Sequence, residues 1–341
     1  MQKAAYYEGN RNVRIGECLS EAPGPDQVQL SVSYCGICGT DLHLVRGNMD
    51  HRVHIPQVFG HEVSGTIYAV GDRVKKFKPG DHVTVRPLDP CGDCPACRAG
   101  HSHVCQRLKF IGIDAPGALQ AFWTVPAHTL HLLPSSLSLE NAALVEPLAV
   151  ACHDVRRARL KSGEYAVVQG GGPIGMLMAI VAKQTGAKVL ITEVNPFRLK
   201  LARELGFEAM NPLKDDIVSY VTDQTHTAGA DVVFEVSGSA AGAASMTKLA
   251  RVRGRIVMVA VFSEPPKVDL FQFFWRELEL VGARLYEPQD FEQAIELASS
   301  GTLPLGRLIS EVCSLEKVPV ALHQLESGGE AMKILVQCSE E

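Results

Sequence analysis

Residues 167 to 175 read Val167-Val168-Gln169-Gly170-Gly171-Gly172-Pro173-Ile174-Gly175. Three of its glycines, Gly170, Gly172 and Gly175, fit the pattern G-x-G-x-x-G between an apolar run and a predicted helix. The first glycine permits a tight turn, the second lets the backbone approach a pyrophosphate, and the third lets helix and strand pack closely. The pattern predicts a dinucleotide site at a helix N-terminus, where free N–H groups favour an anion, although a flexible turn alone can show the same glycines.

A carboxylate follows the glycine turn at the distance that a dinucleotide site requires. Glu193 ends the next predicted strand, about 20 residues beyond the glycines, where an acid accepts hydrogen bonds from the adenosine ribose. This carboxylate also repels a 2′-phosphate, so the sequence favours NAD over NADP. Arg198 leaves three interpretations open, because it could reach a 2′-phosphate, stack on the adenine edge or lie on a helix as a solvated charge.

Strands and helices alternate in the middle of the chain. We expect helices over residues 139–159, 175–185 and 196–205, and strands over 165–168, 188–192, 231–236 and 255–261. Strands that alternate with helices form βαβ units around a parallel sheet. The sequence therefore predicts an α/β protein with a doubly wound parallel sheet, the Rossmann fold.

The segment before residue 140 is richer in glycine, proline and turn dipeptides. Short strands are expected there over 28–34, 63–70 and 82–85. Near the end of the chain we expect a strand over 278–285, helices over 291–299 and 315–325, and a last strand over 333–337. A single core rarely grows past ~250–300 residues, so a chain of 341 residues predicts two domains.

Charge and hydropathy limit the classes of partner. The net charge is −5 and the pI is near 6.2, which argues against a nucleic-acid or anionic-membrane surface. The longest apolar stretch, 176–182, is far shorter than the ~20 residues of a membrane-spanning helix. No secretory signal is visible at the amino terminus. We therefore expect a cytoplasmic protein with no membrane or nucleic-acid partner.

Four cysteines crowd into one short segment. Cys91, Cys94, Cys97 and Cys105 offer four thiolates, which satisfy a tetrahedral zinc ion and leave no open position. The set therefore predicts a structural rather than a catalytic zinc site. An iron–sulfur cluster is the main alternative, and four free thiols in a loop are the simplest one.

A second set of metal-binding side chains lies in two glycine-rich segments. Cys38 and His61 are ligands that suit zinc, and Glu62 or Glu146 can complete a site that keeps one position open for water or substrate. Each residue alone has a plainer interpretation. A lone cysteine is usually a small buried apolar residue, His61 could be a core histidine, and Glu62 could be an exposed strand residue.

Several motifs together resemble a known family, the zinc-containing medium-chain alcohol dehydrogenases. Gly60-His61-Glu62 with Gly65, Gly71 and Val74 is similar to the family's zinc signature. The four-cysteine segment, Val145-Glu146-Pro147-Leu148-Ala149, the glycine turn and Lys333-Ile334-Leu335 follow in the family's order. The resemblance covers essentially the whole chain, and it is greatest to the polyol, sugar-alcohol and threonine dehydrogenase branch.

The resemblance implies a role for each residue that matches a family motif. Cys38, His61 and Glu62 would lie at the catalytic zinc, with Glu146 as a ligand or as a neighbour that holds water. Thr40 and His43 match the proton relay, and the four cysteines match the structural zinc. The residues matching the cofactor site are Gly170, Gly172, Pro173, Ile174, Gly175, Glu193 and Arg198.

The family also implies a domain plan and a reaction. A mainly β, GroES-like catalytic domain would cover residues 1–150 with the zinc lobe at 91–105, an NAD-binding Rossmann domain 151–285, and a return to the first domain 286–341. Two zinc ions per chain and a homotetramer or homodimer are expected. Zinc would polarise a secondary alcohol of a polyol, sugar alcohol or sugar acid. Thr40 would pass the proton through the ribose to His43, and hydride would go to the nicotinamide, leaving a ketone.

Two departures and two other functions bear on this interpretation. Tyr286-Glu287-Pro288-Gln289 lacks the pattern of threonine dehydrogenases, which weakens L-threonine as an alternative substrate, and Cys35 is most simply a packing residue. A zinc and nucleotide sensor without activity would lack a relay, yet Thr40 and His43 are both present. A zinc-ribbon nucleic-acid binder would need a basic stripe that the 91–105 lobe lacks.

Overall fold

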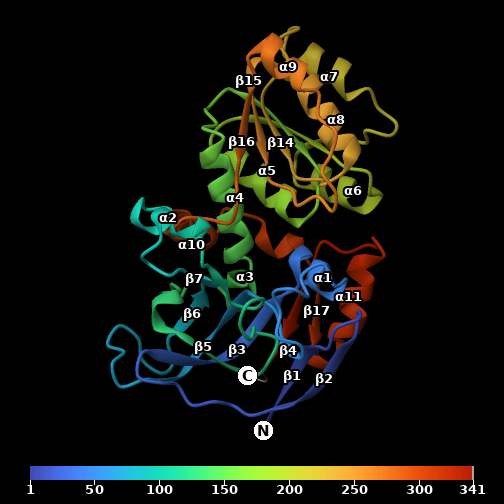
Figure 1. Ribbon diagram of the computed structural model, residues 1–341. Helices are drawn as coiled ribbons and strands as arrows, with labels where there is room; N and C mark the ends of the chain where they lie inside the picture. The colour runs from blue at the N-terminus through green and yellow to red at the C-terminus, as the bar shows by residue number, and fades with distance from the viewer. Residues whose placement is uncertain (340–341) are drawn as a thin grey trace. The chain divides into compact units, whose positions relative to one another are not determined.

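The computed structural model describes residues 1–339 and divides the chain into two compact units. Unit 1 contains residues 1–146 and 291–341, and unit 2 contains residues 147–290. The chain thus passes from unit 1 to unit 2 and back, a few residues from the expected boundaries at 150 and 285. Two helices carry these passages, α4 (Val145–Arg157) and α10 (Pro288–Ser299) (Figure 1).

Unit 1 is built mainly of β-strands. Its larger sheet has the order β10-β6-β5-β3-β18-β17, with β9 also pairing with β3, and its smaller sheet has the order β2-β1-β4. The strands of the larger sheet are β3 (Gln27–Gly36), β5 (Glu62–Val70), β6 (His82–Val85), β9 (Phe122–Pro126), β10 (Leu130–Leu132), β17 (Ile309–Ser314) and β18 (Lys333–Gln337). The expected strands over 28–34, 63–70, 82–85 and 333–337 are therefore confirmed.

The other elements of unit 1 are short. The smaller sheet comprises β1 (Gln2–Tyr7), β2 (Val13–Cys18) and β4 (Gln57–Val58), and a separate ribbon pairs β7 (Leu88–Asp89) with β8 (Lys109–Phe110). The helices are α1 (Gly39–Val45), α2 (Pro95–Arg98), α3 (Leu139–Ala142) and α11 (Val318–Glu326). Unit 1 is the mainly β domain that the sequence predicts, and β18 brings the end of the chain beside β3.

Unit 2 holds a six-stranded parallel sheet of order β13-β12-β11-β14-β15-β16. Its strands are β11 (Tyr165–Gln169), β12 (Lys188–Thr192), β13 (Glu208–Met210), β14 (Ala230–Glu235), β15 (Ala250–Met258) and β16 (Glu279–Gly282). Its helices include α5 (Pro173–Gln184), α6 (Pro196–Glu204), α7 (Ile217–Gln224), α8 (Ala240–Leu249) and α9 (Leu270–Arg276) (Figure 1). The strand order reverses between β11 and β14, which is where open α/β sheets bind ligands at their carboxyl ends.

The predicted Rossmann fold is confirmed, although β13, α7, α8 and α9 were not predicted and several expected elements of the chain have other bounds. The helix expected over 139–159 is two helices, α3 and α4, with a break at 143–144. The strand expected over 278–285 is the shorter β16, and the helix expected over 315–325 begins as a 3-10 turn at Leu315–Lys317 before α11. Within residues 1–339, no helix combines the length and the apolar character needed to cross a bilayer.

Candidate functional site

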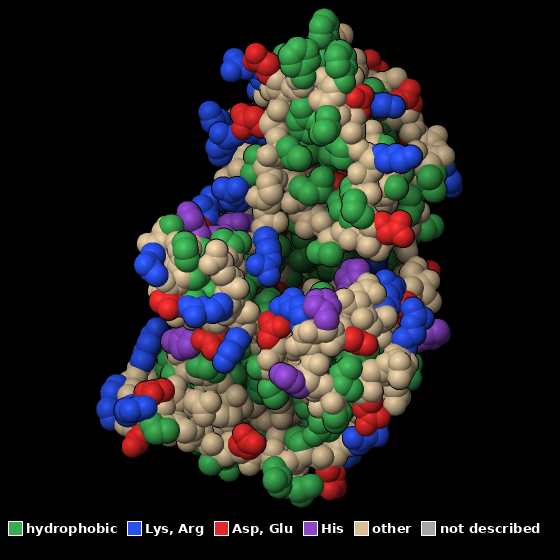
Figure 2. All heavy atoms as spheres, in the orientation of Figure 1, with side chains coloured by type: hydrophobic (Ala, Val, Ile, Leu, Met, Phe, Trp, Pro, Cys, Tyr) green, Lys and Arg blue, Asp and Glu red, His purple; other side chains and the backbone are tan. Residues whose placement is uncertain are grey.

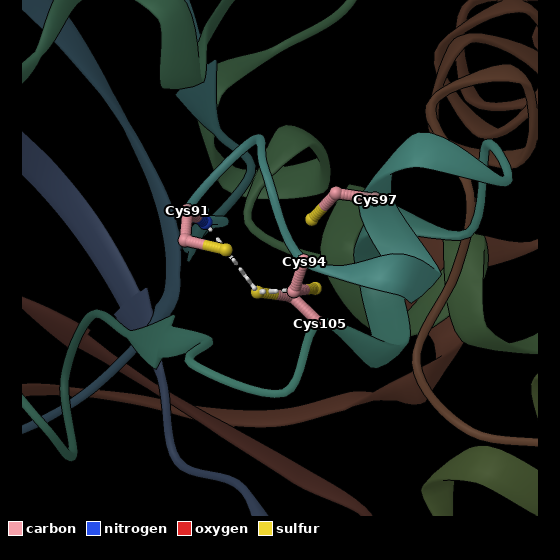
Figure 3. Close-up of side chains that lie close together, drawn as sticks. All are labelled: Cys91, Cys94, Cys97 and Cys105. Carbon is pink, nitrogen blue, oxygen red and sulfur yellow. Dashed lines mark hydrogen bonds between the residues drawn. The ribbon is translucent and has the colours of Figure 1, made fainter.

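The four clustered cysteines converge as the sequence predicts (Figure 3). All four are unpaired, and their sulfur atoms lie within 4.8 Å of one another. The Sγ atom of Cys105 lies 3.4 Å from that of Cys91 and 3.8 Å from that of Cys94. Tetrahedral zinc with bonds of about 2.3 Å places its sulfur ligands ~3.8 Å apart, whereas a disulfide holds them at about 2.05 Å. The donor set therefore fits a tetrahedral zinc ion.

Backbone amides stabilise thiolates in this lobe. The N–H groups of Cys91 and Arg107 lie 3.4 and 3.3 Å from the Sγ atom of Cys105. Backbone hydrogen bonds from Cys97 and Gln106 lower the pKa of Cys94 to about 6. Because the thiolate is the form that binds metal, these bonds favour the metal-binding form of Cys94, whereas burial and the neighbouring thiols raise the pKa of Cys97 to about 12.

The second metal-binding set also converges, at the carboxyl end of β3 and the start of β5. Ligand atoms of Cys38, His61 and Glu62 lie within 4.8 Å of one another. Gly36 pairs with Glu62 across the two strands, and a side-chain carbon at Gly36 would collide with the Glu62 carboxylate. The glycine thus makes room for the acid, and both His61 and Glu62 are fully buried.

Asp41, which sequence reasoning missed, lies behind the histidine ligand. Its Oδ2 atom accepts a hydrogen bond of 2.8 Å from the backbone N–H of Cys38, and its Oδ1 atom lies 3.5 Å from Nδ1 of His61. Burial lowers the pKa of His61, but the Asp41 carboxylate and Cys38 outweigh burial and raise the pKa well above its usual value. The cavity around His61 therefore favours a positive charge, as a zinc site must.

Lys333 is a second residue that sequence reasoning missed. Its Nζ atom donates to both carboxylate oxygens of Glu62, at 2.6 and 2.8 Å, and to the carbonyl oxygen of Ile37, at 3.1 Å. The ammonium is completely buried. Glu62 thus neutralises a lysine while its carboxylate lies beside Cys38 and His61.

Glu146 lies in the first turn of α4 and is buried. It does not belong to the group formed by Cys38, His61 and Glu62. Its place at the zinc site therefore stays a proposal. The two candidate relay residues lie together on α1, whose N-cap is Cys38. Thr40 is half-buried, and the Nδ1 atom of His43 lies 3.3 Å from Nδ2 of Asn48.

The glycine turn of unit 2 has the conformation that a dinucleotide site needs. Gly170 has a φ of +107°, which is strained for any other residue. A side-chain carbon at Gly175 would collide with the carbonyl oxygen of Gly170. Gly172 is the N-cap of α5 and offers no capping side chain, and Pro173 follows as the first helical residue, next to Ile174. The helix N-terminus therefore presents backbone N–H groups.

Glu193, which follows the last residue of β12, holds this turn through hydrogen bonds. Its Oε2 atom accepts a hydrogen bond of 2.9 Å from the N–H of Gly171, and its Oε1 atom accepts from Val194 and Asn195 at 2.7 and 2.9 Å. The nearest guanidinium nitrogen of Arg198 lies 3.9 Å from Oε2. The predicted acid is thus fixed beside the glycine turn, with Arg198 next to it.

A third group of potential ligands, His153, Glu287 and Asp290, is an ion-pair network rather than a metal site. Asp290 accepts from Nδ1 of His153 at 2.8 Å and from Nε of Arg156 at 2.6 Å. The same guanidinium bonds Glu287 at 2.5 Å. Both carboxylates already have partners, because the guanidinium of Arg156 bonds each of them and His153 bonds Asp290. The network joins α4 to the start of α10.

The fold and the two zinc-type donor sets define a class, the zinc-binding oxidoreductases with a Rossmann unit. The sequence matches the alcohol dehydrogenase GroES-like domain over residues 24–135 and the zinc-binding dehydrogenase family over residues 173–300. The chain belongs to the zinc-containing medium-chain alcohol dehydrogenase family, as its motifs predict. It is an oxidoreductase with a GroES-like and a Rossmann domain.

Named relatives resemble the chain over its full length. It is 54% identical over 338 residues, 99% of each chain, to a 2-dehydro-3-deoxy-L-galactonate 5-dehydrogenase of Pseudoalteromonas atlantica. It is 33% identical, over 96% of each chain, to a sorbitol dehydrogenase of Halalkalibacterium halodurans. A solved zinc-binding dehydrogenase of Sinorhizobium meliloti bound to NADP superposes with a TM-score of 0.92 at 30% identity over 99% of each chain.

Proposed function

We propose that the chain oxidises a secondary alcohol of a sugar acid to a ketone, with NAD as the hydride acceptor and the Cys38 site as the catalytic zinc centre. The observation that carries this proposal is the donor group of half-buried Cys38 with buried His61 and Glu62. It lies in a chain 54% identical, end to end, to a dehydrogenase of a 2-dehydro-3-deoxy sugar acid. A polyol is the second candidate substrate, favoured by the sorbitol dehydrogenase relative.

Zinc at this site would supply a Lewis acid that lowers the pKa of the substrate hydroxyl. The residues of the chain do the remaining work. Asp41 holds His61 in place, and Lys333 keeps the charge of Glu62 balanced. Thr40 takes the hydroxyl proton, and His43 carries it to solvent.

NAD is proposed over NADP because of Glu193. Its carboxylate stands at the end of β12, where the adenosine ribose of a dinucleotide lies in Rossmann folds. Arg198 is the opposing influence, because its Nε atom is buried without a hydrogen-bond partner among the described residues. A related structure contains NADP. The four-cysteine lobe adds a second, structural zinc, so we expect two zinc ions per chain.

We further propose a cytoplasmic homo-oligomer. All ten cysteines are unpaired, which is typical of a reducing compartment. Helix α9 exposes its large apolar side chains, and hydrophobic side chains gather on the surface around it (Figure 2): Leu270, Phe271, Phe274 and Trp275 are each 59–77% exposed. Nearby, β16 is an edge strand with Leu280 exposed. An open edge beside an apolar helix suits pairing with a second copy. A mass in solution equal to that of a single chain, measured by light scattering, would contradict the proposed homo-oligomer.

A substrate panel tests the function directly. The zinc-loaded protein is mixed with NAD or NADP and with sugar acids, sugar alcohols and L-threonine, and the absorbance of the reduced cofactor is followed. We expect the highest kcat/KM with a 2-dehydro-3-deoxy sugar acid and NAD. Faster turnover of sorbitol would favour the polyol candidate. Binding of cofactor and zinc without turnover of any alcohol would instead favour a sensor.

A further inference from the structure

Two polar residues lie at the carboxyl ends of adjacent strands, next to the glycine turn of the candidate dinucleotide site. Gln169 ends β11 and Glu235 ends β14, and the two residues pair directly across the parallel ladder. Residues paired in this way point to the same face of a sheet. That face is covered by α8, because Gln169 bonds Ser245 and Glu235 lies against Gly242. Both side chains are buried, with Gln169 5% and Glu235 0% exposed.

One oxygen of Glu235 shapes the loop between β14 and α8. Its Oε1 atom accepts a hydrogen bond of 2.6 Å from the Ser237 hydroxyl and one of 2.9 Å from the backbone N–H of Gly238. This loop touches the glycine turn, since a side-chain carbon at Gly170 would lie 2.9 Å from backbone atoms of Ser237. Glu235 therefore sets the position of a loop that borders the dinucleotide site.

The other oxygen of Glu235 is left without a partner. Among the described residues, neither Oε2 of Glu235 nor Oε1 of Gln169 has a hydrogen bond, although both atoms are buried. Gln169 is oriented by its amide nitrogen, which donates to the Ser245 hydroxyl at 2.7 Å, and Ser245 in turn lies 3.0 Å from the carbonyl oxygen of Gly242. Two paired residues on neighbouring strands thus each bury an acceptor oxygen that has no donor among the described residues.

The surroundings of Glu235 are uncharged. Gln169 on β11, Met258 on β15, Gly242 and Ser245 on α8, and the serines of the loop are its neighbours. Burial raises the pKa of Glu235, and the hydrogen bonds from Ser237 and Gly238 only partly oppose it. A buried carboxylate oxygen without a donor is costly, whereas a single proton on Oε2 would give both unpartnered oxygens a hydrogen bond.

We propose that Glu235 stays protonated at neutral pH and is a positioning residue of the dinucleotide site. Its Oε2 hydroxyl donates to Oε1 of Gln169, which ties β14 to β11 at the point where the strand order reverses. Its Oε1 atom holds Ser237 and Gly238. The neutral acid therefore fixes the β14–α8 loop against the glycine turn. The proposal rests on the proposed function only in that this loop borders a cofactor.

Infrared spectroscopy of the cofactor-free protein tests the protonation state. The difference spectrum between wild type and Glu235→Gln should show the C=O stretching band of a protonated carboxylic acid at pH 7. The matched control, Glu204→Gln, removes an exposed carboxylate and should show only an ionised band. In Gln169→Leu the acid band should move to higher frequency, because its hydroxyl loses its acceptor. Absence of the acid band in wild type would overturn the proposal.

Thermal unfolding gives an independent readout. A folded-state pKa above the unfolded value favours the protonated fold, so the free energy of unfolding of wild type falls as pH rises from 4.5 through the folded pKa. Glu235→Gln lacks this ionisation, so its Tm should rise relative to that of wild type over the same range. A constant Tm difference would mean that Glu235 is ionised and that the Gln169 amide is turned to donate to it, which also overturns the proposal.

Cofactor binding completes the test. The Kd for NADH should stay within about twofold of wild type in Glu235→Gln, because an amide still accepts from Ser237 and Gly238. It should weaken about tenfold in Glu235→Ala, which loses both hydrogen bonds. Equal Kd values in the two variants would remove the positioning role. The first two measurements need neither substrate nor cofactor, so their outcome stands apart from the outcome of the substrate panel.

Discussion

The ammonium of Lys333 lies 2.6 and 2.8 Å from the two carboxylate oxygens of Glu62, with both side chains completely buried. Lys333 begins β18, the last strand of the chain, and Glu62 begins β5 beside the candidate zinc ligands. The carboxyl-terminal segment therefore contacts the candidate metal site. It supplies the positive charge that both carboxylate oxygens of Glu62 contact.

Lys333→Met should destabilise unit 1 strongly. Removing one member of a buried ion pair leaves an uncompensated charge and costs about 3–5 kcal/mol of unfolding free energy. Lys333→Arg keeps the positive charge and should lose less unfolding free energy. Urea unfolding of the two variants measures the difference. A loss below about 1 kcal/mol for Lys333→Met, as for an exposed pair, would show that the Glu62 carboxylate finds another partner.

Cys94→Ser should reduce the zinc content from two ions to one per chain and lower the Tm, since a structural zinc site contributes folding energy. Whatever protein still folds should keep its turnover. Cys18→Ser, which alters a cysteine outside both ligand sets, is the matched control and should keep both ions. Metal analysis and calorimetry on freshly purified protein provide the readouts. A zinc content near one in wild type would exclude one of the two sites.

Glu193→Gln should relax the preference for NAD. The amide oxygen can still accept from Val194 and Asn195, but the bond from Gly171 and the charge that repels a 2′-phosphate are both lost. Arg198→Gln should have the opposite effect and weaken NADP selectively. The ratio of kcat/KM for the two cofactors measures both. Equal kcat/KM values with NAD and NADP in wild type would show that Arg198 already overrides the carboxylate.

His43→Gln should lower turnover by at most about 10²–10⁴-fold, the range for a positioned proton-transfer group. The loss should be largest just above the pKa of His43, where the wild-type imidazole is neutral and can accept the proton. Burial and Arg46 lower the pKa of His43 below its ordinary 6.5, so the neutral base survives to lower pH. The acidic limb of the wild-type profile should therefore fall below pH 6.5 and move upward in Arg46→Gln. An unchanged profile in His43→Gln would leave His43 a structural residue.

Glu146→Gln should reduce zinc affinity or turnover by about 10–100-fold if the carboxylate tunes the zinc. Helix capping should survive, because an amide oxygen still accepts a hydrogen bond. Glu140→Gln alters the acid in the first turn of α3 and controls for that capping effect. Full zinc occupancy and wild-type kinetics in Glu146→Gln would remove Glu146 from the site.

Local pattern was sufficient to predict the parallel sheet and the two thiolate-containing sites. Glycine spacing and apolar runs specify β11, β12 and α5, and cysteine spacing specifies the zinc lobe, because these features depend on residues close in sequence. Helix α8 was missed, since its alanines, glycine and serines show little amphipathic pattern. It is specified instead by the Ser239 cap and by packing on β14 and β15.

Two residues of the candidate site, Asp41 and Lys333, show what a local sequence pattern does not predict. Asp41 and Lys333 act through buried contacts with His61 and Glu62, and Lys333 is 271 positions from Glu62 in the sequence. A single chain carries no local signal for such a pair. The one available hint was a lysine within the apolar run of the last strand, because a charge at a buried strand position needs a partner.

Hydrogen bonds join the two ends of unit 2. His153 and Arg156, near its start, both bond Asp290, its last residue. A segment whose ends lie side by side behaves as an insertion into its host and can be exchanged as a cassette. Residues 147–290 could therefore be grafted as one piece into a relative, carrying cofactor choice with them while the metal centre stays behind. The junctions of such a chimaera lie beside the guanidinium of Arg156. Glu287 and Asp290, the two acids that it bonds, must therefore be transferred together with the segment.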